Sequence, residues 1–324
     1  MANAIIIGID HGNGNMKTAK NVFPCGYICQ VNEPTGIFAK DVVEYNGKYY
    51  TLTSDPFPYE KDKTTNEKCM ILTLFAIAKE IKARSEANNP DFDWKRDFSG
   101  FVGKDVILAV GLPPAHYEKM QRPFKKYFMD GAKYGLNFTY NGKRFSFHLK
   151  DVYVYPQDYA AAVTFKGSII ETYSPIYCID IGDGTADLLV LRDGTPDPSI
   201  KVSREIGMKK LREKIIDTVI NDYSFTLDNA LIEAVLNPIK KTLLDEEIIQ
   251  AINREAADWA EYIVNEFHSK VPDFRGSMTI FTGGGSALLK PHLIATGQFG
   301  RYEFIESINA NAIGYETLTE MILQ

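Results

Sequence analysis

Three glycine-rich turns, each directly after an apolar run, carry the residues of this sequence that could bind phosphate. They lie in residues 5–17 (IIIGIDHGNGNMK), 177–191 (YCIDIGDGTADLLVL) and 279–289 (TIFTGGGSALL). Glycine adopts positive φ and has no Cβ, so successive backbone N–H groups can converge on phosphate oxygens. Three such turns in this order predict a nucleotide held between two domains.

The first two turns each have an aspartate at the end of the apolar run, Asp10 and Asp180. A carboxylate beside phosphate needs a cation between them, and Mg²⁺ is typically held by one or two carboxylates, phosphate and several waters. We therefore predict that Asp10 and Asp180 bind one Mg²⁺ through water. In the third turn, Gly283, Gly284 and Gly285 precede Ser286 and a helix-like ALLKPHLI, which predicts a strand-to-helix junction that favours anions.

Each turn alone has a simpler interpretation. Asp-Gly and Asn-Gly pairs most often form β-hairpin turns that bind no ligand. The order of the turns, their flanking strands and the paired aspartates together favour phosphate binding. A Rossmann site is excluded, because no strand is followed by GxGxxG and then directly by a helix.

Apolar periodicity and turn residues predict the elements that position these turns. We expect strands near residues 4–10, 16–23 and 27–31, hairpins at Asn46-Gly47 and Asn141-Gly142, and a helix over about 66–87. The segment after Pro156 and most of residues 207–270 are predicted to be helical, with Trp259 in the core of the second of these regions.

These motifs resemble those of the actin superfamily, which includes actin, the heat-shock chaperone ATPases and the sugar kinases. DHGNGNMK resembles the first phosphate loop, IDIGDGTADLLVL the second, and FTGGGSALL the adenosine motif. YPQDYAAAV (155–163) and INANAIGYETL (308–318) resemble the two connecting helices. GLPPAHYEKM (111–120) and the terminal ANAIGYETL are most similar to the ParM/StbA group of plasmid-segregating bacterial actins.

The resemblance implies an α/β, actin-like fold, a duplicated ribonuclease H-like architecture with a nucleotide cleft between two domains. Domain I would span residues 1–165, with an outer subdomain inserted at about 33–100 and a C-terminal helix, 308–324, returning to it. Domain II would span 166–307, with an outer helical subdomain at about 207–272. A length of 324 residues suits two domains.

The resemblance also assigns a ligand, ATP or GTP with Mg²⁺. The first two loops would hold the β- and γ-phosphates, Lys17 would contact phosphate, and Asp187 would support the second loop. The third turn would face adenosine and the α-phosphate, and Lys210 and Glu213 would contact the base and ribose. The predicted nucleotide-binding residues are Gly12, Asn13, Gly14, Asn15, Lys17, Gly182, Asp183, Gly184, Thr185, Asp187, Lys210, Glu213, Gly283, Gly284, Gly285 and Ser286.

The predicted catalytic residues are Gln157, Asp180 and Asp10. Hydrolysis needs a group that orients or deprotonates water in line with the γ-phosphate. Gln157 corresponds to the family position that positions this water, where many bacterial relatives have glutamate. An amide cannot take the proton, so Asp180 is the better candidate for proton acceptor, and we expect slow turnover. Gln157 as an ordinary helix-start residue, and Lys17 as a solvent-exposed strand residue, stay open alternatives.

The ParM resemblance implies polar filaments that assemble with bound nucleotide, fall apart after hydrolysis and segregate plasmid DNA through an adaptor protein bound to a plasmid centromere. The alternative is a non-filamentous phosphotransferase or phosphohydrolase of the superfamily, of the sugar kinase or polyphosphatase type. A non-polymerising switch of the chaperone ATPase kind is less favoured, because the motifs occupy nearly the whole chain.

Composition limits the partners of the chain. A net charge of −6 disfavours direct binding of nucleic acid, which needs a concentrated basic face. The basic cluster KMQRPFKK (119–126) is a solvated helix face or a contact for a filament neighbour or adaptor. The four cysteines do not complete a metal site and are expected to be core thiols. With no leader-like or membrane-spanning run, we expect a cytoplasmic protein without membrane contact.

Overall fold

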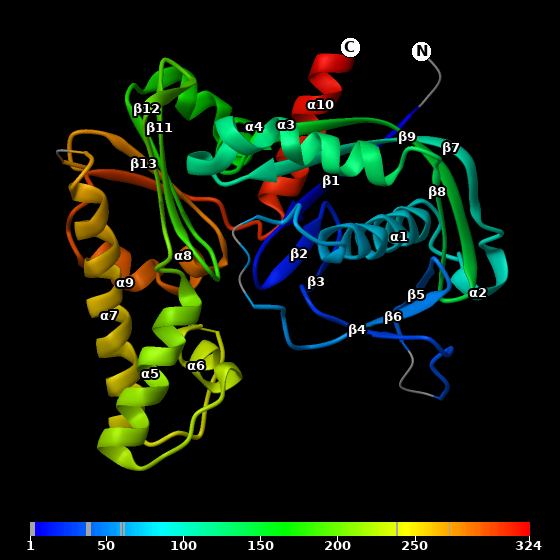
Figure 1. Ribbon diagram of the computed structural model, residues 1–324. Helices are drawn as coiled ribbons and strands as arrows, with labels where there is room; N and C mark the ends of the chain where they lie inside the picture. The colour runs from blue at the N-terminus through cyan, green and yellow to red at the C-terminus, as the bar shows by residue number, and fades with distance from the viewer. Residues whose placement is uncertain (1–3, 37–39, 59, 61, 238, 272) are drawn as a thin grey trace. The chain divides into compact units, whose positions relative to one another are not determined.

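The structure, a computed structural model, describes residues 4–36, 40–58, 60, 62–237, 239–271 and 273–324. The chain forms two compact units (Figure 1). Unit 1 comprises Met1–Thr164 and Asn309–Gln324, and unit 2 comprises Phe165–Ile308. No helix in the described ranges is long and apolar enough to span a bilayer.

Unit 1 is built on a nine-stranded sheet with the order β3-β2-β1-β7-β9-β8-β5-β6-β4. Its strands are β1 (Ile5–His11), β2 (Asn15–Thr18), β3 (Val22–Pro24), β4 (Tyr27–Gln30), β5 (Val42–Tyr45), β6 (Lys48–Leu52), β7 (Phe101–Leu112), β8 (Leu136–Tyr140) and β9 (Lys143–Pro156). β1, β7 and β9 are parallel neighbours, and β2 pairs antiparallel with β1. The carboxyl ends of three parallel strands therefore meet at one edge, beside the turn from β1 to β2.

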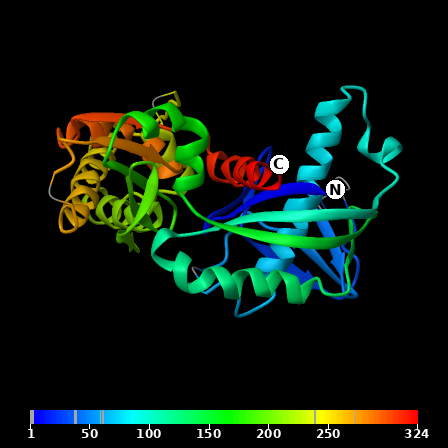
Figure 2. The same ribbon diagram turned by 90° about the horizontal axis from the view of Figure 1, so that it is seen from above.

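Helices cover both faces of this sheet. They are α1 (Lys68–Asn88), α2 (Trp94–Asp97), α3 (Pro114–Gly131), the start of α4 (Tyr159–Thr172) and α10 (Ala310–Leu323). α1 and α3 share a core with Ile7 and Ile9 of β1, whereas Tyr315 of α10 packs with Ala109 and Tyr155. Figure 2 shows α10 and α3 on opposite sides of the long strands β7 and β9.

Unit 2 is built on a five-stranded sheet with the order β12-β11-β10-β13-β14. Its strands are β10 (Ile176–Ile181), β11 (Ala186–Arg192), β12 (Thr195–Arg204), β13 (Met278–Thr282) and β14 (Arg301–Phe304). Its helices are α5 (Met208–Tyr223), α6 (Asn229–Leu236), α7 (Glu246–His268), α8 (Gly284–Leu288) and α9 (Lys290–Ala295). α5 and α7 run side by side, and their apolar faces pack with the sheet in one core (Figure 1).

Most of the locally predicted elements are confirmed. Both hairpins are present, and Asn46, Gly47, Asn141 and Gly142 all adopt positive φ, as a type I′ turn requires. The single strand predicted for residues 16–23 is wrong, because a turn closed by the Thr18 N–H and the Asn21 carbonyl (2.9 Å) separates β2 from β3.

The helical prediction for residues 207–270 needs two corrections. Two stretches of it, residues 224–228 and the described part of 237–245, are not helical. The described residues of this region therefore form three separate helices, α5, α6 and α7. Trp259 is only half-buried rather than central to the core, and its indole N–H donates to the Ile206 carbonyl (3.2 Å). The apolar ring packs at the edge of the core because its N–H needs a polar partner there.

Candidate functional site

The first glycine turn joins β1 to β2 and places Asp10 between two polar side chains. Asp10 lies directly opposite Lys17 in the antiparallel register, and the Lys17 Nζ is 3.2 Å from Asp10 Oδ2. Gln157 Nε2 donates to Asp10 Oδ1 at 2.9 Å. Gln157 follows the carboxyl end of β9 and precedes α4, where its own N–H donates to the Leu112 carbonyl (2.9 Å).

Asp10 is buried and anionic. Burial alone raises its pKa, but the charge and hydrogen bond of Lys17, with the charge of Lys63, hold that pKa below its ordinary value. The neighbouring His11 adds no positive charge, because burial lowers its pKa to about 3. The first turn thus presents one carboxylate that is ionised at neutral pH.

Three contacts hold the shape of the first turn. The Cys25 N–H donates to the Gly14 carbonyl (3.0 Å), and the Cys25 thiol donates to the Gly12 carbonyl (3.1 Å). The Lys63 ammonium donates to the His11 carbonyl. Glycine is required at position 12, because a Cβ there would lie 2.4 Å from the Asn15 carbonyl oxygen. Sequence reasoning missed both Lys63 and the contact of Cys25, since neither residue belongs to a motif around the turn.

The second turn joins β10 to β11 and places two carboxylates opposite each other. Asp180 and Asp187 are paired in the antiparallel register, and Thr185 Oγ1 donates to Asp187 Oδ2 (2.8 Å). The Gly182 N–H donates to the Thr185 carbonyl (2.8 Å), which closes the turn. Burial, with the charge of Asp180, raises the pKa of Asp187 to about 7.

The second turn also receives the N-terminus of α5. The N–H groups of Gly207, Met208 and Lys209 donate to the carbonyls of residues 184, 182 and 183 at 3.3, 3.0 and 2.9 Å. Satisfying these first N–H groups fixes the turn against the helix. The ion pair of Arg212 with Asp183 adds a second link between α5 and the turn.

Lys210 and Glu213 lie on a different face of α5 from Arg212. Both are exposed and line a groove of about 610 Å³ with Trp259 of α7. Among the described residues, no hydrogen bond or ion pair joins either side chain to the second turn. The side chain of Arg212, which the sequence analysis did not single out, forms an ion pair with Asp183 of the turn.

The third turn joins β13 to α8, which confirms the predicted strand-to-helix junction. Gly283 has φ +88°, and a Cβ there would lie 1.9 Å from Asp180 Oδ1, so only glycine fits beside the second-turn aspartate. Gly283 and Gly284 are partly exposed, whereas Gly285 and Ser286 are buried. α8 is only five residues long, so the glycines rather than a helix terminus define this turn.

The first turn offers an oxygen ligand of the kind that Mg²⁺ prefers. The carboxylate of Asp10 is a hard oxygen ligand, and Mg²⁺ usually keeps water in most of its coordination positions. Within the described ranges, no three His, Cys, Asp or Glu side chains cluster as a ready metal site. The residues therefore fit a hydrated Mg²⁺ shared with phosphate, and not a closed protein cage.

Known proteins resemble both halves of the chain. The N-terminal domain of actin-like proteins matches residues 8–159, and the C-terminal domain of the archaeal MreB-like actin homologue matches residues 178–295. No curated protein matches the sequence significantly.

Solved structures of an archaeal actin homolog and of a ParM filament share the fold. The crystal structure of Ta0583, an archaeal actin homolog, has 19% identity and a TM-score of 0.74 over 98% of this chain and 99% of that chain. Its complex with ADP has 18% identity and a TM-score of 0.72 with the same coverage. A 15-stranded ParM filament from Clostridium botulinum has 17% identity and a TM-score of 0.73, again over 98% and 99%. The predicted two-domain actin-like α/β fold is confirmed, and the chain belongs to the actin superfamily.

Proposed function

We propose that the chain is a slow, Mg²⁺-dependent nucleoside triphosphatase, acting on ATP or GTP, that forms dynamic filaments with bound nucleotide and disassembles after hydrolysis. The observation that carries the proposal is the buried, anionic Asp10 held between Lys17 and Gln157 at a glycine turn. In the proposal, the Asp10 carboxylate binds the metal ion, the Lys17 ammonium binds phosphate and the Gln157 amide orients water.

Each turn has a separate task in the proposed reaction. Residues 12–15 and 182–185 bind the β- and γ-phosphates through backbone N–H groups. Lys17 exchanges its contact with Asp10 for a phosphate oxygen. Asp10 and Asp180 would hold Mg²⁺ through water, and Mg²⁺ bound there would supply positive charge to the transferring phosphoryl group.

The attack on the γ-phosphate depends on two side chains. Gln157 orients the attacking water with its amide, and Asp180 accepts the proton. Asp187, held by Thr185 and facing Asp180, keeps the second turn in place. The third turn, residues 283–286, faces the adenosine and the α-phosphate. Slow turnover follows, because an amide cannot deprotonate the water.

Filament formation is the proposed use of this chemistry. The fold is shared with a ParM filament structure. Head-to-tail contacts that do not close into a ring generate a helix, and nucleotide shifts the population toward the conformer that makes them. We further propose that the filaments segregate plasmid DNA through a DNA-binding adaptor protein, without direct contact of this chain with DNA.

Two measurements on the purified chain test the proposal. Phosphate release and sedimentation are followed with Mg-ATP, Mg-GTP, Mg-ADP and no nucleotide, with EDTA as the metal-free control. We expect triphosphate-dependent pelleting, filaments by negative stain, and loss of both activities with EDTA. Asp10→Ala and Asp180→Ala should abolish hydrolysis, while Asp105→Ala, which removes an exposed ion pair with Lys150, should not.

The outcomes separate the alternatives. Hydrolysis that requires added sugar or polyphosphate, without pelleting, would instead establish a metabolic phosphotransferase. Parental hydrolysis by both aspartate variants would show that the paired-aspartate mechanism is wrong. Protein that stays soluble with every nucleotide, well above micromolar concentration, would remove the filament proposal.

A further inference from the structure

We propose that Glu80, Arg84 and Glu316 form one partly buried clamp that positions the two strands of the first glycine turn, with Arg84 as its central positioning residue. The inference rests on the proposed function for its catalytic consequence. Its structural part, the placement of β1 and β2, can be tested without nucleotide.

The geometry of the first turn depends on how β1 and β2 lie against each other. Asp10 on β1 and Lys17 on β2 are opposite residues of one antiparallel ladder. A shift of either strand therefore changes the distance between the carboxylate and the ammonium. Whatever holds the two strands together sets the spacing of the groups that would receive Mg²⁺ and phosphate.

Glu80 of α1 holds the end of β2. Its carboxylate is fully buried and accepts hydrogen bonds from Thr18 Oγ1 (2.6 Å), the Lys20 N–H (3.0 Å) and Asn21 Nδ2 (3.1 Å). Thr18 directly follows Lys17 in the chain. Three donors on one carboxylate oxygen fix the position of this strand end relative to α1.

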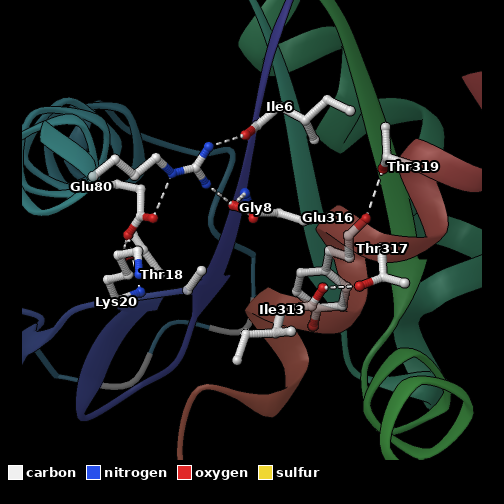
Figure 3. A network of polar contacts seen from close by, with 12 residues as sticks. Ile6, Gly8, Thr18, Lys20, Glu80, Ile313, Glu316, Thr317 and Thr319 are labelled. Carbon is white, nitrogen blue, oxygen red and sulfur yellow. Dashed lines mark hydrogen bonds and ion pairs between the residues drawn. The ribbon is translucent and has the colours of Figure 1, made fainter. Parts of the chain in front are cut away.

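Glu316 of α10 holds β1. It accepts a hydrogen bond from the Gly8 N–H at 2.7 Å, two residues before Asp10. The helix lies so close that a Cβ on Gly8 would be 2.0 Å from the Ala312 carbonyl oxygen. Figure 3 shows Glu80 and Glu316 on the two sides of β1.

Arg84 of α1 joins the two carboxylates. Its Nε donates to Glu80 Oε1 (2.8 Å), one terminal nitrogen donates to the Ile6 carbonyl (2.9 Å), and the other pairs with Glu316. The planar guanidinium is suited to three divergent acceptors, which a lysine ammonium on a flexible stem cannot hold in the same geometry. One side chain thus ties α1, β1 and α10 together.

The charges make Arg84 the critical member. The buried Glu80 and the partly buried Glu316 share one cation, so its removal leaves both carboxylates without their counter-ion, which is unfavourable. Burial raises the pKa of Glu316 to about 7 even with Arg84 present. Loss of Arg84 should therefore release α10 from β1 and loosen the first turn.

The test compares Arg84→Met, Arg84→Lys and Glu316→Gln with a matched control, Thr319→Val. Thr319 is a buried residue of the same helix α10, and its hydroxyl bonds with Tyr155 of β9 (2.8 Å), away from the first turn. Thermal unfolding gives the general loss of stability. Hydrogen–deuterium exchange of residues 10–18 without nucleotide gives the local effect, and Mg-ATP hydrolysis gives the functional one.

We expect faster exchange of residues 10–18 in the order Arg84→Met, Arg84→Lys, Glu316→Gln, and no change in Thr319→Val. The KM for Mg-ATP should rise by about tenfold in Arg84→Lys, because misplaced binding groups weaken the complex. If Arg84→Met does not fold, Arg84→Lys and Glu316→Gln provide the test of the clamp. The clamp would be overturned if the Arg84 and Glu316 variants lose as much stability as Thr319→Val but keep the parental exchange rate at residues 10–18 and the parental KM. If the parental protein hydrolyses no nucleotide but Arg84→Lys still exchanges faster than the parental protein at residues 10–18, the proposed function is refuted and the clamp stands.

Discussion

Gln157 donates a hydrogen bond of 2.9 Å from Nε2 to Asp10 Oδ1, although the two residues are 147 positions apart. The contact forms because β1 and β9 are both parallel neighbours of β7, so their carboxyl ends meet at one edge of the sheet. It leaves the amide oxygen of Gln157 to accept a hydrogen bond from water. A water bound there would be held at a fixed position relative to the carboxylate proposed to hold Mg²⁺.

Truncation of Gln157 should therefore slow hydrolysis more than it weakens binding. We expect Gln157→Ala to lower kcat by about 10²-fold, the lower end of what positioned proton-transfer groups contribute. The KM for Mg-ATP should change little, because the phosphate-binding turns are intact. A steady-state phosphate-release assay measures both constants. An unchanged kcat would assign Gln157 to the start of α4 with no part in the reaction.

Alanine at position 283 should damage the second turn as well as the third. Gly283→Ala places a Cβ 1.9 Å from Asp180 Oδ1 on a backbone of positive φ, so Asp180 must move. Gly297→Ala is the matched control, because Gly297 also has positive φ (64°) but no atom near its Cβ position. Both variants should lose about 1 kcal/mol of stability from the backbone conformation.

The difference between the two variants measures the displacement of Asp180 together with that of the Ile181 carbonyl, which would lie 2.6 Å from the same Cβ. We expect hydrolysis to fall at least about tenfold in Gly283→Ala and to be parental in Gly297→Ala. Thermal unfolding and phosphate release on the same preparations provide the comparison. Equal activity in both variants would mean that the position of Asp180 does not matter for hydrolysis.

Arg212 should contribute to nucleotide binding by holding the second turn. Its guanidinium pairs with Asp183 and is largely buried. We expect Arg212→Met to weaken nucleotide binding by about tenfold, because the free Asp183 carboxylate would then repel phosphate. Arg275→Met removes an exposed pair with Asp273 in the same unit and should have no effect on binding. Titration with a fluorescent ATP analogue measures the affinity, and equal affinities would contradict the assignment.

The stability of unit 2 should fall as the pH rises through the range in which Asp187 ionises. Its pKa in the folded protein is about 7, above the ordinary value of 3.8, because it is buried and faces Asp180. The folded state therefore favours the neutral acid. This stabilisation is complete below about pH 4 and is lost as the pH rises to about 7.

Asp187→Asn should remove this dependence while keeping an acceptor for Thr185. Between pH 4 and pH 8 the parental unfolding free energy should fall relative to the variant by about 2–4 kcal/mol. The chain has two tryptophans, so Trp259 fluorescence in a Trp94→Phe background reports on unit 2 in urea titrations at each pH. Parallel pH profiles for the two proteins would show that Asp187 titrates as an exposed aspartate does.

Local features of the fold followed from the sequence. The hairpins at residues 46–47 and 141–142 are present because Asn-Gly accepts the positive φ of the type I′ turn. The helix predicted over residues 66–87 is α1, Lys68–Asn88, since its apolar spacing extends over several turns. The division of residues 16–23 into two strands was missed, because a four-residue turn there has no glycine or proline to mark it.

The sequence by itself determined where the three turns lie and which aspartates belong to them, because glycine and a strand-terminal carboxylate act over a few neighbouring residues. Only the tertiary structure decided which distant side chains reach those turns. Gln157 reaches Asp10, Arg212 of α5 pairs with Asp183 of the second turn, and Arg84 joins two helices to β1. Such contacts depend on strand order and on the face of a helix that packs inward, and no short stretch of sequence specifies either of these.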